Sequence, residues 1–159
     1  MKRVFLYLIA VIALSACTTT NRLTPTEMKA ISTKQFESNY DVVFRSVISL
    51  LQSEGALVED TDRETGLIKA VKRIEKKAFG YSENASISKI GFYIDAINDE
   101  LTEVKLTIYE GTSKKTAAWA SSYGQQQTQN KEAIVQDPVV YQTWFNNLRA
   151  EIERRKATR

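Results

Sequence analysis

Apolar residues recur at helical spacing in two segments of the chain. In residues 40–54 they follow the i, i+3, i+4 pattern of a helix with one buried face, which Ser38 or Asn39 can cap and Gly55 can end. The second stripe follows Pro138, a residue suited to a first helical position, with Asp137 before it as the cap. This second stripe consists of Tyr141, Trp144, Phe145, Leu148 and Ile152. We predict an amphipathic helix for each segment.

Strict alternation of apolar and polar residues predicts strands between the two helices. Residues 88–96 and 102–110 alternate most clearly, and the INDEL sequence between them is typical of a hairpin turn. Residues 56–61 and 66–74 predict a second hairpin, and residues 33–37 predict a short strand before the first helix. A polar loop is expected at 75–86.

Residues 111–136 carry the weakest pattern of the chain. Alternation of Ala117, Trp119, Ser121 and Tyr123 is compatible with one more strand, whereas the glutamine-rich stretch after them is typical of a polar loop.

The order of elements is therefore β-α-β-β-β-β-α, with one further strand left open. Strands with one apolar face need an apolar partner, and two amphipathic helices can supply it. We predict an α+β fold, in which an antiparallel sheet of four to six strands carries both helices on one face.

The N-terminal pattern is of another kind. Met1, Lys2 and Arg3 precede a charge-free apolar run from Val4 to Leu14, the arrangement of a secretory signal. Eleven residues at about 1.5 Å each cover only half of a hydrocarbon core of about 30 Å, so a membrane-spanning helix is disfavoured. Small residues and the single cysteine, Cys17, follow the run.

Leu14-Ser15-Ala16-Cys17 resembles the lipobox of bacterial lipoproteins. The resemblance implies cleavage between Ala16 and Cys17, a diacylglycerol on the Cys17 sulfur and an acyl chain such as palmitate on the new amine. Two or more acyl chains give stable membrane anchoring. Thr18, in place of the aspartate that commonly retains such proteins in the inner membrane, favours the outer membrane, facing the periplasm.

Three segments follow from these patterns. Residues 1–16 are expected to be the signal peptide, residues 17–32 a lipidated N-terminus with a flexible tether, and residues 33–159 a single globular domain. A tether of that length could reach about 50 Å when extended.

The globular part resembles the helix-grip domains found in a lipoprotein component of the outer-membrane β-barrel assembly complex. The shared features are F-x-x-x-Y-D-x-V-F at residues 36–44, D-x-x-T-G-L-I at residues 62–68, and the late hairpin. The resemblance is at the level of the fold and implies a helix-grip arrangement.

Composition narrows the function. Loss of Lys2 and Arg3 with the signal leaves 20 basic against 19 acidic residues, which gives no support for a nucleic-acid partner. Histidine is absent and the sole cysteine is the lipid acceptor, so the usual general bases and thiol nucleophiles are missing and we expect no enzyme and no cofactor. The acids of residues 60–64 are interpreted as a hairpin turn rather than as metal ligands.

One basic and aromatic cluster stands out, at Lys72, Arg73, Lys76, Lys77, Phe79 and Tyr81. It is interpreted either as an edge strand guarded by lysines and followed by a loop, or as a contact surface for lipid headgroups or a protein partner.

We therefore expect a membrane-anchored envelope lipoprotein that serves as a non-catalytic binding or scaffold domain, with a partner protein in the envelope. The alternative is a carrier or sensor that grips an apolar ligand between the sheet and the last helix, with Tyr141, Trp144 and Phe145 lining the cleft. A closed core between helix and sheet favours the scaffold, whereas an open apolar cavity favours the carrier.

Overall fold

A computed structural model describes residues 22–77, 82–116 and 129–158 of the chain. In these residues the helices are α2 (Pro25–Ser32), α3 (Tyr40–Ser53) and α4 (Pro138–Ala157). The strands are β1 (Thr33–Phe36), β2 (Leu57–Asp62), β3 (Leu67–Lys77), β4 (Ser82–Ala96), β5 (Thr102–Thr116) and β6 (Gln129–Ile134).

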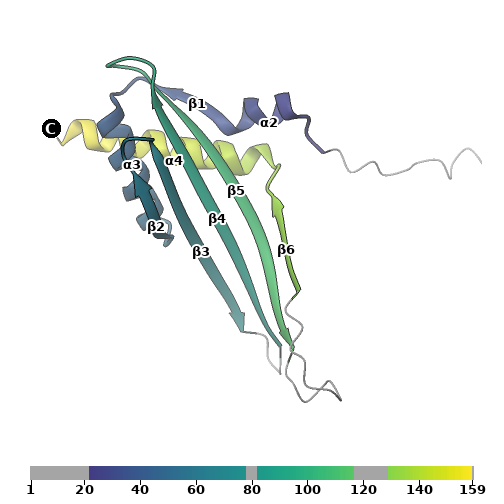
Figure 1. The fold of residues 1–159 in the computed structure, drawn as a ribbon. Coiled ribbons are helices and arrows are strands. Elements are labelled where there is room, and N and C mark those ends of the chain that lie inside the picture. The colour runs from purple at the N-terminus through teal and green to yellow at the C-terminus, as the bar shows by residue number, and fades with distance from the viewer. Residues whose placement is uncertain (1–21, 78–81, 117–128, 159) are drawn as a thin grey trace, which may run out of the picture.

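The strands form one antiparallel sheet in the order β1-β5-β4-β3-β2, with β6 also paired to β5. Because β4 occupies one edge of β5 along its whole length, β1 and β6 share the other edge, at residues 102–105 and 109–114. Helices α3 and α4 contact each other on one face of the sheet (Figure 1). The predicted α+β fold, an antiparallel sheet with its helices on one face, is confirmed.

Both predicted amphipathic helices are present, with the expected caps. The Asn39 side chain accepts a hydrogen bond from the backbone N–H of Val42 at the start of α3, and Gly55 follows the helix with a φ of +72°. Asp137 caps α4 by accepting from the N–H of Val139, with Pro138 in the first turn.

The core lies between the two helices and the sheet. Alternate positions along the strands point toward the helices, as their period of two requires. The buried sheet residues are Phe36, Ile68, Ala70, Ile90, Phe92, Ile94, Val104, Leu106 and Ile108. The helices add chiefly Val43, Val47, Leu50, Leu51, Tyr141, Phe145, Leu148 and Ile152.

The hairpin between β2 and β3 turns on the acidic segment, as predicted. Asp62 Oδ1 accepts hydrogen bonds from the N–H groups of Glu64 and Thr65. A hydrogen bond from the Thr65 side chain, followed by these backbone contacts, lowers the pKa of Asp62. Gly66 has a φ of +74° and lies so close to the backbone of Ile94 that a Cβ would fall 1.9 Å from its carbonyl oxygen. Only glycine satisfies both conditions without strain.

The strands are longer than the sequence pattern predicts. The loop expected at 75–86 is wrong at both ends, because β3 continues to Lys77, β4 begins at Ser82 and their ladder runs on to the Lys77–Glu83 pair. Strand β5 likewise continues to Thr116. A ladder satisfies backbone groups whatever the side chains are, so polar composition did not end the strands.

The weakly patterned region 111–136 is described only in part. Ala117, Trp119, Ser121 and Tyr123, the positions considered for one more strand, lie outside the described residues. The strand that the structure shows here is β6, which pairs with β5 from Tyr109 to Lys114.

The flexible tether predicted for residues 17–32 is wrong for its second half, where α2 forms. Thr24 and Glu27 make a reciprocal capping box, and Pro25 occupies the first turn. Met28 and Ile31, three residues apart on one side of α2, pack against the core cluster. The folded domain therefore begins before residue 33, as Figure 1 shows for α2 beside β1.

Candidate functional site

The predicted cleavage and lipidation residues, Ala16 and Cys17, lie outside the described residues. The structure does show where the chain after them joins the domain. The N–H of Leu23 donates a hydrogen bond of 3.1 Å to Oε1 of Gln136, next to the cap of α4. No helix in the described ranges is long and apolar enough to cross a membrane.

The basic and aromatic cluster is not gathered on one face. Lys72 points to the helix side, where its Nζ lies 3.4 Å from Oε2 of Glu54, and Arg73 points to the opposite side of the sheet. Lys76 and Lys77 belong to the last part of β3, and Phe79 and Tyr81 lie outside the described residues.

The edge-strand interpretation of this cluster fits the backbone. Strand β2 pairs with β3 only as far as the Leu57–Val71 pair, whereas β4 follows β3 to Lys77. Residues 72–77 therefore have a strand on one side alone among the described residues. Lysines on such a segment disfavour pairing with other chains.

The three residues proposed to line a ligand cleft are packed into the core instead. Tyr141 is fully buried and Phe145 is 3% exposed, while Trp144 is half-buried. The Phe145 ring lies 6.2 Å from that of Phe36, and the Trp144 ring meets Phe92 edge-on at 6.1 Å. These side chains fill the space between helix and sheet rather than line an opening.

Tyr141 keeps its one polar atom satisfied within this core. Its hydroxyl donates to the carbonyl oxygen of Val135 at 2.9 Å. Burial raises the pKa of Tyr141 above its usual value, so the phenol stays neutral and remains a donor.

In the part of the chain that the structure describes, the face of the sheet opposite α3 and α4 carries no helix, and it exposes several large apolar side chains. We call this surface the helix-free face. The cross-strand register places Leu57, Val71, Lys89, Tyr109 and Ile134 in one row. Leu57 is 71% exposed and Tyr109 is 44% exposed. A second row contains Tyr93, which is 40% exposed.

Two lysines on the helix-free face pair with neighbouring carboxylates. Lys89 Nζ lies 2.7 Å from Glu132 Oε1, and Lys105 Nζ lies 3.1 Å from Glu103 Oε1. Lys105 also lies 5.2 Å from the centre of the Tyr93 ring, within cation–π range. The face therefore offers apolar and aromatic contacts beside locally balanced charge, a composition that suits protein interfaces.

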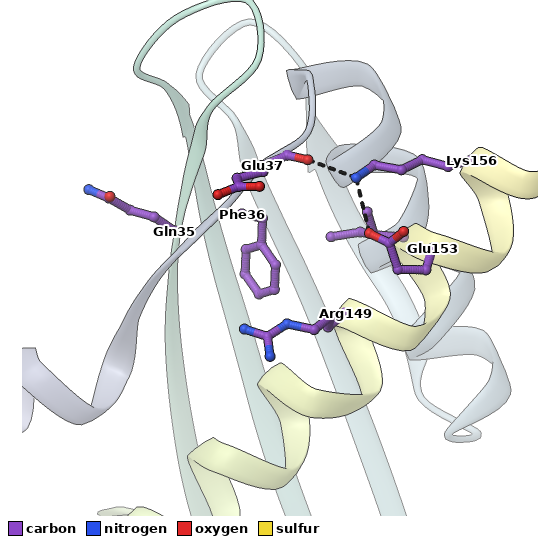
Figure 2. A pocket seen from close by; sticks show the side chains of 7 residues that line it. Gln35, Phe36, Glu37, Arg149, Glu153 and Lys156 are labelled. Carbon is purple, nitrogen blue, oxygen red and sulfur yellow. Dashed lines mark hydrogen bonds and ion pairs between the residues drawn. The ribbon is translucent and has the colours of Figure 1, made fainter.

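A small polar pocket lies where the end of α4 meets β1 (Figure 2). It has a volume of about 280 Å³, with Phe36 and Ile152 as its apolar walls and Arg149 at its rim. The Lys156 Nζ donates to the Glu37 carbonyl oxygen at 2.7 Å and to Glu153 at 3.0 Å. This ammonium group is therefore already paired within the protein. Its contact with Glu37 ties the end of α4 to the residue that follows β1.

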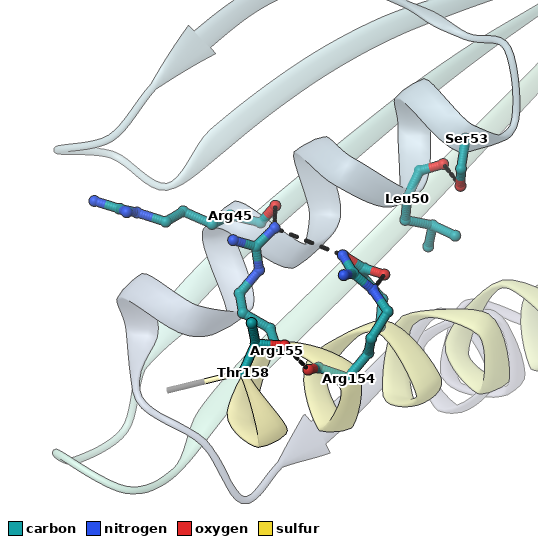
Figure 3. Close-up of polar contacts among 7 residues, drawn as sticks. Arg45, Leu50, Ser53, Arg154, Arg155 and Thr158 are labelled. Atoms are coloured by element: carbon teal, nitrogen blue, oxygen red, sulfur yellow. Dashed lines mark hydrogen bonds and ion pairs between the residues drawn. The ribbon is translucent and has the colours of Figure 1, made fainter.

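Polar contacts also join α4 to α3 (Figure 3). Arg155 donates to the Arg45 carbonyl oxygen, and Arg154 pairs with Glu151, whose carboxylate also receives the Ser49 hydroxyl. The hydrogen bond from Arg154 is the main reason why the pKa of Glu151 falls to about 2. These contacts hold the helix layer together.

The described residues contain no cluster of three or more histidine, cysteine, aspartate or glutamate side chains that could hold a metal ion. The carboxylates of Asp95 and Asp99 are both on exposed residues.

Comparison with protein-family models gave no match, and a search of curated proteins gave none either.

Sequence reasoning did not single out the helix-free face. The alternation in residues 102–110 shows which side chains share a face, but it does not show which residues of different strands stand side by side. That depends on the register across five strands, and the register is set partly by a bulge in β2 between Val58 and Asp60.

Proposed function

We propose that this chain is a bacterial lipoprotein, anchored through lipid on Cys17 in the outer membrane and facing the periplasm. Its domain acts as a non-catalytic binding or scaffold module for another envelope protein. The basic start, the short apolar run and the Leu14-Ser15-Ala16-Cys17 motif support the anchor. Thr18 supports the outer-membrane location.

The observation that carries the binding role is the row of exposed apolar residues on the helix-free face. Leu57 and Tyr109 lie on different strands of one row, outside the core that the helices complete. The row holds two apolar pairs, Leu57 with Val71 and Tyr109 with Ile134, on either side of Lys89. Exposed apolar side chains grouped on one surface are typical of interaction sites. Lys89 is paired with Glu132 and Lys105 with Glu103. These lysines therefore add little net charge that could attract nucleic acid or other polyanions.

The packing of α4 supports this role over that of a carrier. A carrier would hold its ligand between sheet and helix, where Tyr141 and Phe145 instead contact core residues directly. Binding on the outer face needs no rearrangement of that core.

The anchor is tested by metabolic labelling with radioactive palmitate. The natural chain should be labelled and recovered with membranes, whereas Cys17→Ser should accumulate as an unlabelled precursor, because the thiol is the only lipid acceptor. Label on the Cys17→Ser chain would disprove the lipoprotein assignment.

The binding face is tested by photo-crosslinking in intact envelopes. A photoreactive residue at Tyr109 should give a discrete protein adduct, which Leu57→Glu should remove without lowering the melting temperature. The matched control is the same photoreactive residue at Thr143, which is exposed on the helix side of the molecule. Equal adducts at both positions would contradict a specific face.

A further inference from the structure

The chain that follows the lipidation motif joins the domain at one corner. Leu23 is held by its hydrogen bond to Gln136, and Asp137 and Pro138 begin α4 immediately afterwards. We call the group Arg22, Leu23, Pro138 and Val139 the anchor-side corner. Arg22, Pro138 and Val139 are exposed, and Leu23 is half-buried.

Val139 is an exposed apolar residue that the fold does not use. It is 67% exposed, whereas Val140 beside it packs against the core and Tyr141 is fully buried. Along the rest of α4 the exposed side is built from polar or small residues. They are Gln142, Thr143, Asn146, Asn147, Arg149, Ala150, Glu153, Arg154, Lys156 and Ala157. The large apolar residue on the outside of α4 thus lies in the turn nearest to Leu23.

The length of the connecting chain limits how far this corner can be from the lipid. Residues 18–22 separate Cys17 from Leu23, and such a stretch spans at most about 20 Å in any conformation. Because Thr24 caps α2 and Met28 and Ile31 pack on the core, the docked helix adds no free length. Val139 is three residues beyond Gln136, within about 11 Å of it along the chain.

We propose that the anchor-side corner is the surface that lies against the lipid bilayer, with Val139 at the level of the headgroups. The proposal rests on the proposed lipid anchor at Cys17. Arg22 is placed to meet lipid phosphates, while Pro138 and Val139 supply the apolar contact. These contacts are weak alone, but the covalent anchor keeps the corner at high effective concentration near the membrane, so they suffice to orient the domain.

The orientation has a matched control at the other end of α4. Val139 and Lys156 are about 25 Å apart along the helix axis. Lys156 lines a shared pocket with Asp99 and Glu100 of the turn between β4 and β5. Ile97, in the same turn, is 48% exposed and apolar. It is therefore a comparable residue on the part of the molecule that we expect to point away from the bilayer.

The test uses the lipidated full chain in vesicles of phosphatidylethanolamine and phosphatidylglycerol. Val139→Cys and Ile97→Cys can each be labelled alone with an environment-sensitive fluorophore, because the Cys17 sulfur carries lipid. At position 139 the emission should shift to the blue and be quenched by lipids with a quencher near the headgroup. At position 97 the quenching should be several-fold weaker.

Three results would overturn the proposal or its premise, each in a different way. Equal quenching at both positions, or no quenching at position 139 in chains that float with vesicles, would disprove the contact between the anchor-side corner and the bilayer. It would not affect the proposed lipid anchor. Chains that fail to float after palmitate labelling has also failed would reject the proposed function. A probe at 139 that is shielded in intact envelopes yet exposed in protein-free vesicles would assign the corner to a protein and overturn the bilayer contact.

Discussion

Phe145 is the side chain through which the middle of α4 reaches the sheet, since its ring lies 6.2 Å from that of Phe36 in β1. Truncation of a buried aromatic residue typically costs about 3–5 kcal/mol. Phe145→Ala should therefore lower the melting temperature by roughly 10 °C or more in a domain of this size. The control, Asn146→Ala on the exposed side of α4, should barely change it. Equal, small effects in thermal melts would show that α4 is not docked through Phe145.

Gly55 and Gly66 allow the cost of backbone strain to be measured apart from the cost of a steric clash, because their φ values are nearly the same. Gly55 and Gly66 have φ values of +72° and +74°, but a Cβ at Gly55 would meet nothing within 4 Å, while one at Gly66 would fall 1.9 Å from the Ile94 oxygen. Gly55→Ala should cost about 1–2 kcal/mol from the backbone alone. Gly66→Ala should cost clearly more, because the β2–β3 turn must also move away from β4. Chemical denaturation of the two variants would measure the difference, and similar losses would contradict the close approach.

Glu151 should make the helix layer sensitive to acid. Its pKa falls from 4.5 to about 2 because Arg154 bonds to the carboxylate in the folded state. A carboxyl group whose pKa is lower in the folded state stabilises the fold at every pH above its unfolded-state pKa. For Glu151 that stabilisation is lost as the pH falls from about 4.5 to about 2. The stability difference between the natural chain and Glu151→Gln should therefore shrink across this window. A difference that stays constant with pH in denaturation experiments would rule out the Arg154 pairing as its source.

At the scale of elements, α2 belongs to the domain although the sequence suggested a tether. A chain that begins at Thr33 loses the contacts of Met28 and Ile31 with the core. It should melt several degrees below a chain that begins at Leu23, since each apolar side chain removed from partial burial costs about 1 kcal/mol or more. Thr24→Ala, which removes the capping box but keeps those contacts, should cost only about 1 kcal/mol. Identical melting temperatures of the two shortened chains would show that residues 23–32 add nothing to the stability of the domain, as expected of a tether.

The comparison of α2 with α3 shows which elements the sequence can predict. Helix α3 has a long apolar stripe and a strong cap, so its pattern is legible without knowledge of its neighbours. Helix α2 has eight residues and only Met28 and Ile31 as apolar contacts, too few to define a face before the sheet is known. Its capping box, Thr24 with Glu27 three residues later, was the available signal.

The two candidate surfaces, the inner stripe of α4 and the row on the helix-free face, also depend on neighbours that the local sequence does not show. Tyr141 and Phe145 were correctly placed on the inner stripe of α4, but whether that stripe encloses a cavity depends on the volume of its partners, which a sequence does not express. The row from Leu57 to Ile134 joins residues from opposite ends of the domain. Such non-local neighbours arise from strand order and register alone.

At the scale of the whole molecule, strand β5 pairs with one strand from the N-terminal part of the domain, β1, and one from the C-terminal part, β6. Its pairing with β4 joins neighbours in the chain, whereas β1 reaches it from residues 33–36 and β6 from residues 129–134. Local pairings of this kind form faster than distant ones, because less chain has to be ordered to close them. The β4–β5 hairpin should therefore be an early centre of folding.

This topology also sets an order of assembly for a chain that crosses a membrane with its N-terminus first. On the proposed export route β1 emerges early, directly after α2, yet its partner residues, 102–105, emerge about seventy positions later. Until then the Phe36 side chain has no partner strand, and only local pairings such as the β2–β3 hairpin are available to the emerging chain. In refolding kinetics, Phe36→Ala should mainly accelerate unfolding, while Leu106→Ala in the hairpin should slow folding itself.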